Sequence, residues 1–268
     1  AGQPALGLTY FDKEQALVQS LLGDDHPRMG VVLANRTLAL MELHRSQEGI
    51  AVGEDALRRV RRWMPGSPVE AAILNNLAGL YRDLQDPARA RVLLREALAA
   101  ARVAYGNNHV FVGQFRTNLA EAEEKMGDLP AALREAEEGY AVLSRVVPAG
   151  HYLLGVNQLV LGKLQRRAQG CAAALPTLRR AMTLFREQPR VLPAMREKSL
   201  FYVARCLAEQ KTREAHAEAR TLAEAALALD REYDPEGEDP TDLVQLLGSL
   251  GVVVKPRVAP AEGSARAR

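Results

Sequence analysis

Apolar positions recur with helical spacing between Pro68 and Gly106, which is the clearest structural segment of the chain. Before the turn Gln85-Asp86-Pro87 these positions are Leu74, Leu77, Leu80, Tyr81 and Leu84. After the turn they are Val92, Leu93 and Leu98. Spacings of three and four residues place apolar side chains on one face of an α-helix. The segment therefore predicts two amphipathic helices joined by a short turn.

The same pattern returns in steps of 41 or 42 residues, with four landmarks in register. The first helix of each repeat is entered at His26-Pro27, Ser67-Pro68, His109-Val110 and His151-Tyr152. An asparagine inside that helix falls at Asn35, Asn76 and Asn118. Small residues of the second helix fall at Gly49, Ala90, Ala132 and Ala174, and again at Ala56, Ala97, Gly139 and Ala181. A period shared by four landmarks predicts an array of helical hairpins.

Each landmark has a physical reason. Proline is tolerated in the first turn of a helix, where its missing N–H would be unpaired anyway. Ser67 and Asp25 are suited to cap the helices at these entrances. Small residues at matched positions of the second helix allow a neighbouring helix to approach closely. The repeat therefore specifies both the helix starts and the helix contacts.

The flanks depart from the strict period. A fifth repeat from about Leu192 to Tyr233 has about three extra residues near Glu209–Arg213. The segment Tyr10 to Leu22 resembles the second helix of a preceding repeat, and Asp239-Pro240 predicts the start of a short helix that continues to Leu247 and covers the last repeat. We therefore expect an N-terminal helix in residues 1–23, about five repeats in 24–234, a capping helix in 235–253 and a disordered tail in 254–268.

Composition agrees with a helical protein and excludes several classes. The 268 residues include 35 basic and 33 acidic side chains, so no general attraction to nucleic acid or membranes follows. No run of 18 apolar residues and no signal-peptide core is present. Cys171 and Cys206 cannot make a disulfide framework, which favours a reducing compartment and a cytoplasmic location. Because the chain starts at Ala1, we expect it to be processed or excised from a longer protein.

The segment Asn-Leu-Ala-Gly-Leu-Tyr at 76–81, followed by Ala90 and Ala97-Leu98, resembles the tetratricopeptide repeat. The long period and the Gly-x-x-His-Pro entrance from Gly23 to Pro27 resemble the kinesin light chain subtype. The resemblance covers roughly residues 23 to 233. It implies an all-α fold, a right-handed α-solenoid of tetratricopeptide-type helical hairpins whose first helices line a concave groove.

The resemblance assigns Asn35, Asn76 and Asn118 to this groove, one in each of three successive repeats. A carboxamide both donates and accepts hydrogen bonds, so it is able to hold the backbone of an extended peptide. Receptors of this family that bind extended peptides use asparagine at this position. The alternative is structural, in which each asparagine bonds only a neighbouring helix or water.

One turn further along the same face lie Arg82, Glu121, Lys163 and Arg205, with Arg166 one turn beyond Lys163. The asparagine is replaced by Val160 in the fourth repeat and by Tyr202 in the fifth. These changes predict a groove graded from amide-lined to basic and partly aromatic, suited to an acidic segment or a C-terminal carboxylate. The alternative is that the basic residues form an ordinary solvated face.

Other candidate chemistry is weak. Asp24-Asp25-His26 has no matched ligand set for a metal, and Gly162-Lys163 lacks the remaining residues of a P-loop. The basic run Arg58–Trp63 offers contacts to nucleic acid, but Leu57, Val60 and Met64 share one face with the arginines outside it, as in an ordinary amphipathic helix. We expect no cofactor, no metal and no catalytic activity.

The sequence thus predicts a non-catalytic interaction scaffold that binds an extended peptide or protein segment in its concave groove. The competing hypothesis is a regulatory or self-association arm of a larger signalling protein, such as a kinase or transcription regulator. In that case the groove is filled in cis or by another copy, which includes a homodimer.

Overall fold

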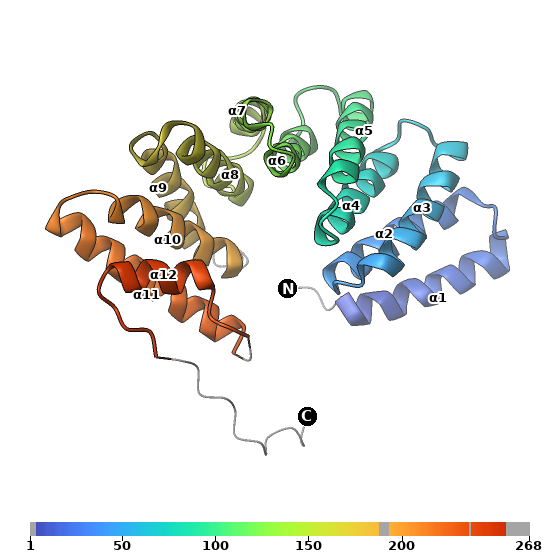
Figure 1. Ribbon diagram of the computed structural model, residues 1–268. Helices are drawn as coiled ribbons and strands as arrows, with labels where there is room; N and C mark the ends of the chain where they lie inside the picture. The colour runs from blue at the N-terminus through green and yellow to red at the C-terminus, as the bar shows by residue number, and fades with distance from the viewer. Residues whose placement is uncertain (1–3, 188–192, 236, 256–268) are drawn as a thin grey trace, which may run out of the picture. The chain divides into compact units, whose positions relative to one another are not determined.

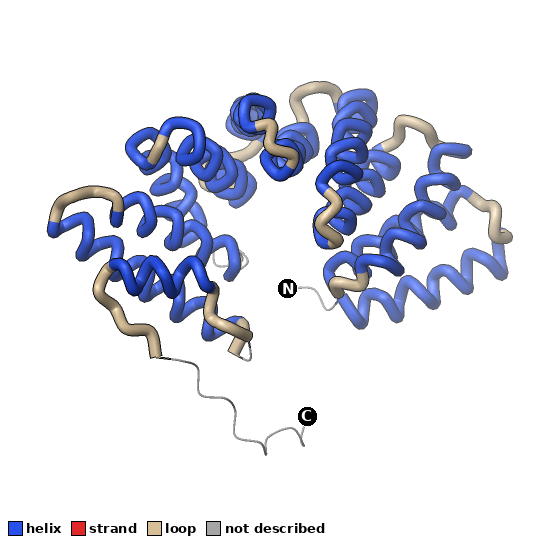
Figure 2. The backbone as a smooth tube through the Cα atoms, in the orientation of Figure 1, coloured by secondary structure: helices blue, strands red, loops and turns tan. Residues whose placement is uncertain are grey.

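The computed structural model describes residues 4–187, 193–235 and 237–255, and in these residues every regular element is a helix (Figures 1 and 2). The chain divides into two compact units, Ala1–Pro148 and Ala149–Arg268. The N-terminal unit contains α1 (Pro4–Leu22), α2 (Pro27–Glu42), α3 (Ser46–Trp63), α4 (Pro68–Asp83), α5 (Pro87–Tyr105), α6 (Val110–Lys125) and α7 (Leu129–Val146). The C-terminal unit contains α8 (Tyr152–Gln169), α9 (Cys171–Glu187), α10 (Pro193–Ala208), α11 (Arg213–Tyr233) and α12 (Thr241–Ser249).

Consecutive helices pack as hairpins, which confirms the predicted all-α solenoid. The hairpins are α2–α3, α4–α5 and α6–α7 in the N-terminal unit, and α8–α9 and α10–α11 in the C-terminal unit. Within the N-terminal unit each hairpin also packs on the next, through α3 with α4 and α5 with α6. Each hairpin thereby buries the apolar stripe that it cannot bury alone.

Histidine caps three of the first helices. The Nδ1 atoms of His26, His109 and His151 accept hydrogen bonds from the backbone N–H two residues ahead, at 3.2, 3.3 and 3.2 Å. Ser67 caps α4 as predicted, because its hydroxyl accepts from the N–H of Glu70 at 3.2 Å. The expectation that Asp25 caps α2 is wrong, since the cap is the next residue, His26. The recurring histidines are therefore part of the repeat's local structure.

The small residues of the second helices are buried as predicted. Ala90, Ala132 and Ala174 are at most 1% exposed. The first helices carry a further small position that the pattern analysis missed, occupied by Gly30, Ala71, Gly113 and Gly155. A Cβ atom on Gly113 would lie 2.6 Å from Leu143 Cγ, and one on Gly155 would lie 2.7 Å from Phe185 Cε1. At Gly113 and Gly155 the two helices of the hairpin approach too closely for a Cβ atom unless the facing side chain moves, whereas the second repeat accommodates the methyl group of Ala71.

The last hairpin accommodates the extra residues at its turn. Helix α11 begins six residues before the buried Ala219, whereas α9 begins three residues before the equivalent Ala174. The insertion therefore lengthens the first turn of α11 and leaves its packing face in place.

The two ends of the helical array are closed differently. Helix α1 packs on α2 through Leu8, Phe11 and Val18. At the other end, Leu243 and Leu247 of α12 are buried in a cluster formed with α10 and α11. Helix α12 begins at Thr241 with Pro240 as its N-cap and ends at Ser249, so the predicted start at Asp239-Pro240 and end at Leu247 are wrong by one or two residues.

The predicted tail lies mostly outside the described residues. Only residues 254 and 255 of that segment belong to the described part of the chain, and Val254 packs against the cluster of α10, α11 and α12. Residues 256–268 are not described. Within the described ranges no helix is long and apolar enough to cross a lipid bilayer.

A disulfide joins Cys171, the first residue of α9, to Cys206 near the end of α10. Their Cα atoms lie 4.9 Å apart although 35 residues separate them in the sequence. Both side chains are buried, with 8% and 0% exposure. Two isolated cysteines carry no pairing signal in the sequence. Because they are paired in the structure, the expectation of a reducing compartment loses its basis.

Candidate functional site

The first helices of the N-terminal unit line two adjoining cavities. The larger cavity, of about 360 Å³, lies among α2, α4 and α6 and presents the carboxamides of Asn35, Asn75, Asn76 and Gln114. Its apolar lining includes Val31, Leu38, Val69, Phe111 and Phe115. Carboxamides beside an apolar wall suit a ligand that has both backbone amides and apolar side chains.

The second cavity, of about 230 Å³, continues along α4 and α6. It is lined by Asn75 and Gln114, which it shares with the first cavity, and by Arg82, Asn118 and Glu121. Charged groups are therefore concentrated in this second cavity, and the first is lined by amides and apolar groups. The two together form a graded surface within the N-terminal unit, which we call the amide groove.

A hydrogen bond and an ion pair connect α4 to α6 within the groove, and both involve predicted site residues. The side-chain Nδ2 of Asn118 donates a hydrogen bond to Oδ1 of Asn75 at 2.8 Å. Arg82 Nη1 pairs with Glu121 Oε2 at 3.0 Å. Asn118 thus uses one of its two N–H groups within the chain, and the charges of Arg82 and Glu121 offset each other. These contacts hold α4 against α6 and fix the orientation of the groups that line the groove.

The predicted site residues of the N-terminal unit fall on these cavities. Asn35 is exposed and Asn76 half-buried, and both line the first cavity. Asn118 lines the second cavity together with Arg82 and Glu121. The structure thus brings all five to the faces of α2, α4 and α6, with Asn118 also engaged by Asn75.

In the C-terminal unit the predicted residues gather around two neighbouring aromatic rings, those of Tyr202 and Phe201. Lys163 Nζ lies 5.7 Å and the guanidinium carbon of Arg166 lies 6.0 Å from the centre of the Tyr202 ring. The guanidinium carbon of Arg205 lies 5.9 Å from the centre of the Phe201 ring, and its Nη1 lies 3.9 Å from a carboxylate oxygen of Asp242 on α12. Cations over ring faces are electrostatically favourable. The set forms a basic and aromatic cluster of α8 and α10.

Sequence reasoning missed the apolar wall of the groove. Phe111 and Phe115 stack with ring centres 5.9 Å apart, and Tyr105 contacts Phe111 at 5.5 Å. The signal was present, because Phe111 and Phe115 lie one turn apart on the face that also carries Asn118. The sequence left the role of Asn75 open, because the equivalent position in the other repeats is not an asparagine.

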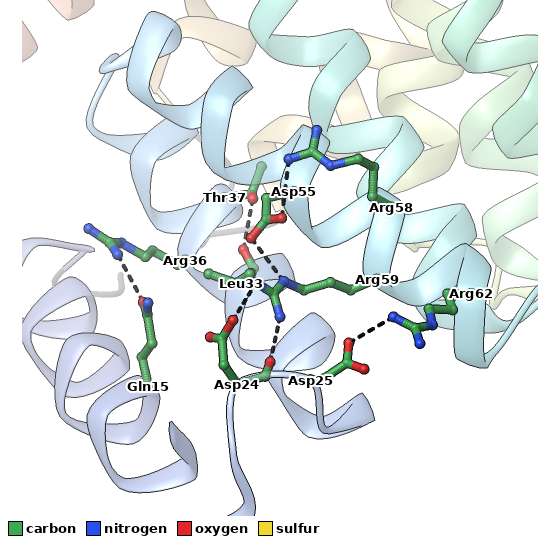
Figure 3. Close-up of polar contacts among 10 residues, drawn as sticks. All are labelled: Gln15, Asp24, Asp25, Leu33, Arg36, Thr37, Asp55, Arg58, Arg59 and Arg62. Atoms are coloured by element: carbon green, nitrogen blue, oxygen red, sulfur yellow. Dashed lines mark hydrogen bonds and ion pairs between the residues drawn. The ribbon is translucent and has the colours of Figure 1, made fainter. Parts of the chain in front are cut away.

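The basic run of α3 is engaged within the chain (Figure 3). Arg59 bridges Asp55 on its own helix at 2.9 Å and Asp24 in the loop before α2 at 3.1 Å. Arg62 pairs with Asp25 at 3.1 Å. These arginines therefore hold the α1–α2 loop against α3.

The Asp24-Asp25-His26 segment likewise has structural partners. Both aspartates pair with arginines of α3, and the His26 ring caps α2. Within the described residues no group of three or more histidine, cysteine, aspartate or glutamate side chains is arranged to hold a metal ion.

Comparisons with known proteins agree with the helical-repeat fold. Residues 32–102 and 69–145 match the tetratricopeptide repeat family. No curated protein matches the sequence significantly. Among solved structures, BtubC (BKLC) from P. vanneervenii superposes with a TM-score of 0.68 at 12% identity, over 90% of this chain and 96% of that chain.

Two further structures share the fold. The nearly identical repeats of a putative kinesin light chain from Podosopora anserina give a TM-score of 0.58 at 18% identity, covering 78% of this chain and 98% of that chain. NprR in complex with its cognate peptide NprX gives 0.59 at 14% identity, covering 90% and 76%. Residues 32–145 therefore belong to the tetratricopeptide repeat family, and the chain shares its fold with kinesin light chain-like repeats.

Proposed function

We propose that the protein binds an extended peptide or protein segment in the amide groove, without catalysing a reaction on it. The observation that carries this proposal is the combination, on α2, α4 and α6, of five carboxamides with an apolar wall in two adjoining cavities. The NprR structure supports it, because a protein of this fold is there in complex with a peptide.

The spacing of the carboxamides suits an extended chain. Packed helices lie about 8–10 Å apart, and an extended chain rises about 3.3 Å per residue. If the first helices of successive repeats have similar spacing, an extended ligand passes one first helix for about every three of its residues. Asn35 and Asn76 then hold the ligand backbone from successive repeats, which does not depend on the ligand's side chains.

Hydrogen bonds alone are too weak to account for useful affinity. Each contributes about 0.5–1.5 kcal/mol net, whereas micromolar binding needs about 8 kcal/mol. Burying one large apolar side chain adds about 1.5–3 kcal/mol. We therefore assign the remainder to ligand side chains packed on Leu38, Phe111 and Phe115, and expect the ligand to carry apolar residues at this point.

The basic and aromatic cluster of the C-terminal unit is a second candidate contact. Lys163 and Arg166 flank Tyr202 and are both partly accessible. A ligand carboxylate, from an acidic side chain or a free C-terminus, is the group that such cations favour. Substitution of Lys163 or Arg166 tests this contact separately, because neither residue lines the amide groove.

The decisive experiment measures peptide affinity in groove variants. A peptide selected from a displayed library of random decapeptides on the wild-type protein serves as the probe, and fluorescence anisotropy measures its Kd. The double variant Asn35→Ala/Asn76→Ala removes two carboxamides that make no side-chain hydrogen bond to other described residues, so we expect affinity to fall about tenfold or more with helicity unchanged.

Matched variants distinguish the groove from a general effect. Asn108→Ala, in the loop before α6, removes a carboxamide away from both groove cavities and should leave Kd unchanged. Asn118→Ala also breaks the bond to Asn75, so a loss of affinity there is expected together with some loss of stability. Unchanged affinity in Asn35→Ala/Asn76→Ala would exclude the amide groove as the binding site.

The competing hypothesis, a regulatory arm whose groove is filled by another copy, predicts a different result. The groove substitutions would then reduce self-association measured by light scattering at several concentrations, and added peptide would compete with it. Peptide binding that is independent of protein concentration instead supports capture of a separate ligand.

A further inference from the structure

An arginine in the last turn of α3 is paired with two carboxylates. Arg61 Nε donates to Glu70 Oε1 of α4 at 2.8 Å, and its Nη2 pairs with Glu96 of α5. The other oxygen of Glu70 accepts from the backbone N–H of Gly66, in the loop before α4, at 2.7 Å. Glu70 is only 8% exposed. The end of α3 and the loop that follows it therefore hold one oxyanion, which the chain itself supplies.

The next repeat keeps this arginine but lacks the carboxylate. Arg102, in the last turn of α5, is the repeat equivalent of Arg61. Val112 stands at the position of Glu70, so an apolar side chain replaces the acidic one. The backbone N–H of Asn108, equivalent to the loop N–H that Glu70 accepts from, donates no hydrogen bond within the described chain. The groups that hold an oxyanion in one repeat therefore recur in the next without it.

The second carboxylate of the earlier arrangement has a different partner here. Glu138 of α7 is the repeat equivalent of Glu96. It pairs with Arg116 of α6, which is 7% exposed and also pairs with Glu135. Arg102 consequently forms no ion pair with a described residue.

A cavity of about 350 Å³ lies at this position in the N-terminal unit. Its lining includes Arg102, Asn108, Val112, Arg116, Glu138 and Arg145. Arg145, in the last turn of α7, also forms no ion pair with a described residue, and the preceding repeat has Val103 at its position. A cation in a last turn interacts favourably with the helix dipole, but that interaction leaves the guanidinium donors free. Two such guanidinium groups therefore line one cavity, and none of its residues lines the amide groove.

From these observations we infer that this cavity binds a phosphate group, as a second ligand site separate from the amide groove. A carboxylate suffices in the preceding repeat because it is attached to the chain, whereas a diffusing ligand has to bring more charge. A phosphate monoester carries about −1.5 to −2 charge at pH 7 and three acceptor oxygens. These oxygens match the free donors of Arg102, Arg145 and the Asn108 N–H, and arginine frequently binds phosphate through two parallel hydrogen bonds.

Two-dimensional NMR of the isotope-labelled protein tests the site with inorganic phosphate as the probe. Phosphate is titrated from about 0.1 to 30 mM at constant ionic strength, an order-of-magnitude range around millimolar affinity. The backbone N–H of Asn108 and the Nε–H of Arg102 should shift and saturate. The corresponding groups of Gly66 and Arg61 are the internal control and should not shift, because Glu70 already accepts from them.

Substitutions assign the binding to the cavity. Arg102→Gln/Arg145→Gln removes two exposed charges and should raise the phosphate Kd at least about tenfold, with unchanged circular dichroism. The matched control is Arg134→Gln, also exposed on α7 but outside the cavity, which should bind phosphate as the wild type does. Val112→Glu restores the carboxylate of the preceding repeat and should abolish the Asn108 shift. If that variant fails to fold, the arginine variants decide.

Two further probes identify the class of ligand. Acetate should bind at least about tenfold more weakly than phosphate, because it carries a single charge. A peptide that contains phosphoserine is compared with its unphosphorylated form. Tighter binding of the phosphopeptide than of inorganic phosphate assigns the site to a phosphorylated protein segment, and weaker or equal binding assigns it to free phosphate.

The outcomes separate clearly. The absence of a saturable Asn108 shift, or a phosphate Kd that is unchanged in Arg102→Gln/Arg145→Gln, overturns the inference. Acetate binding as tight as that of phosphate overturns the assignment to phosphate. Because Asn35→Ala/Asn76→Ala leaves the cavity unchanged, that variant should still bind phosphate even if peptide binding is lost.

Discussion

The junction of α5 with α6 and the junction of α9 with α10 occupy the same place in the repeat, and they are held together by different chemistry. In the N-terminal unit Glu123 of α6 is only 1% exposed and pairs with Arg95 of α5 at 2.6 Å and with Arg91 at 3.5 Å. In the C-terminal unit the corresponding junction carries the disulfide Cys171–Cys206. The small residues that set the helix spacing recur in both units. The interaction that joins the two helices of the junction is an ion pair in one unit and a disulfide in the other.

The hairpins also differ at their closest internal contact. In α6–α7 the backbone of Gly113 lies under Leu143, and in α8–α9 that of Gly155 lies under Phe185. The equivalent positions of α10–α11 hold Glu197 and Asp230. Carboxylates replace apolar contact in the last hairpin, and burial raises the pKa of Glu197, with repulsion from Asp230 adding to the rise and Lys198 opposing it. We therefore expect the last hairpin, α10–α11, to depend more on the disulfide that joins α10 to α9 than the earlier hairpins depend on any single link.

Removing the disulfide should have the largest effect. A crosslink that closes a loop of 35 residues restricts the unfolded chain and contributes about 2–4 kcal/mol. Cys171→Ser/Cys206→Ser, or reduction of the wild type, should therefore increase hydrogen exchange of α9 and α10 peptides strongly. Peptides of α4 and α5 serve as the internal control and should change little, because contacts in repeat arrays are local. Equal loss of protection in both units would contradict the comparison.

Breaking the ion pair of the α5–α6 junction should destabilise the protein less than removing the disulfide does. The increase in hydrogen exchange should appear in the N-terminal unit instead of the C-terminal unit. Glu123→Gln removes the buried charge, and the expected cost is about 1–2 kcal/mol, since hydrogen bonds to charged groups contribute about 1.5–3 kcal/mol and Arg95 remains accessible to water. Hydrogen exchange should increase in α5 and α6 while α9 and α10 keep their protection. Glu121→Gln, at the more exposed pair with Arg82, is the matched control and should cost less.

The smallest effect is expected at Glu197 and should depend on pH. Because its pKa is raised in the folded state, the folded protein binds the proton more tightly than the unfolded chain does. Stability then falls as pH rises through the interval between the ordinary carboxyl pKa and the raised one. Glu197→Gln should therefore raise Tm at pH 7 and make no difference below about pH 4, as measured by thermal denaturation. A lower Tm at pH 7 would show that the charge stabilises the hairpin.

The periodic features of the structure were predictable because they depend on local sequence. The entrances at His26, Ser67, His109 and His151 mark helix starts in the structure, and Ala90, Ala132 and Ala174 are buried as their register indicated. Helix period, capping and the need for small residues at close contacts act within a few residues. They therefore leave a direct trace in the sequence even where individual bounds, such as those of α12, are off by a residue or two.

Contacts between distant residues were decided only by tertiary structure. The disulfide joins residues 35 positions apart, and the Asn118–Asn75 bond spans 43. Whether Asn118 faces a ligand or a neighbouring helix depends on how α6 rotates and approaches α4, which the period of the sequence leaves open. The sequence by itself determined the repeat and the faces of its helices. The tertiary structure alone decided which side chains on those faces meet, because that depends on helix separation and rotation to within an ångström or two.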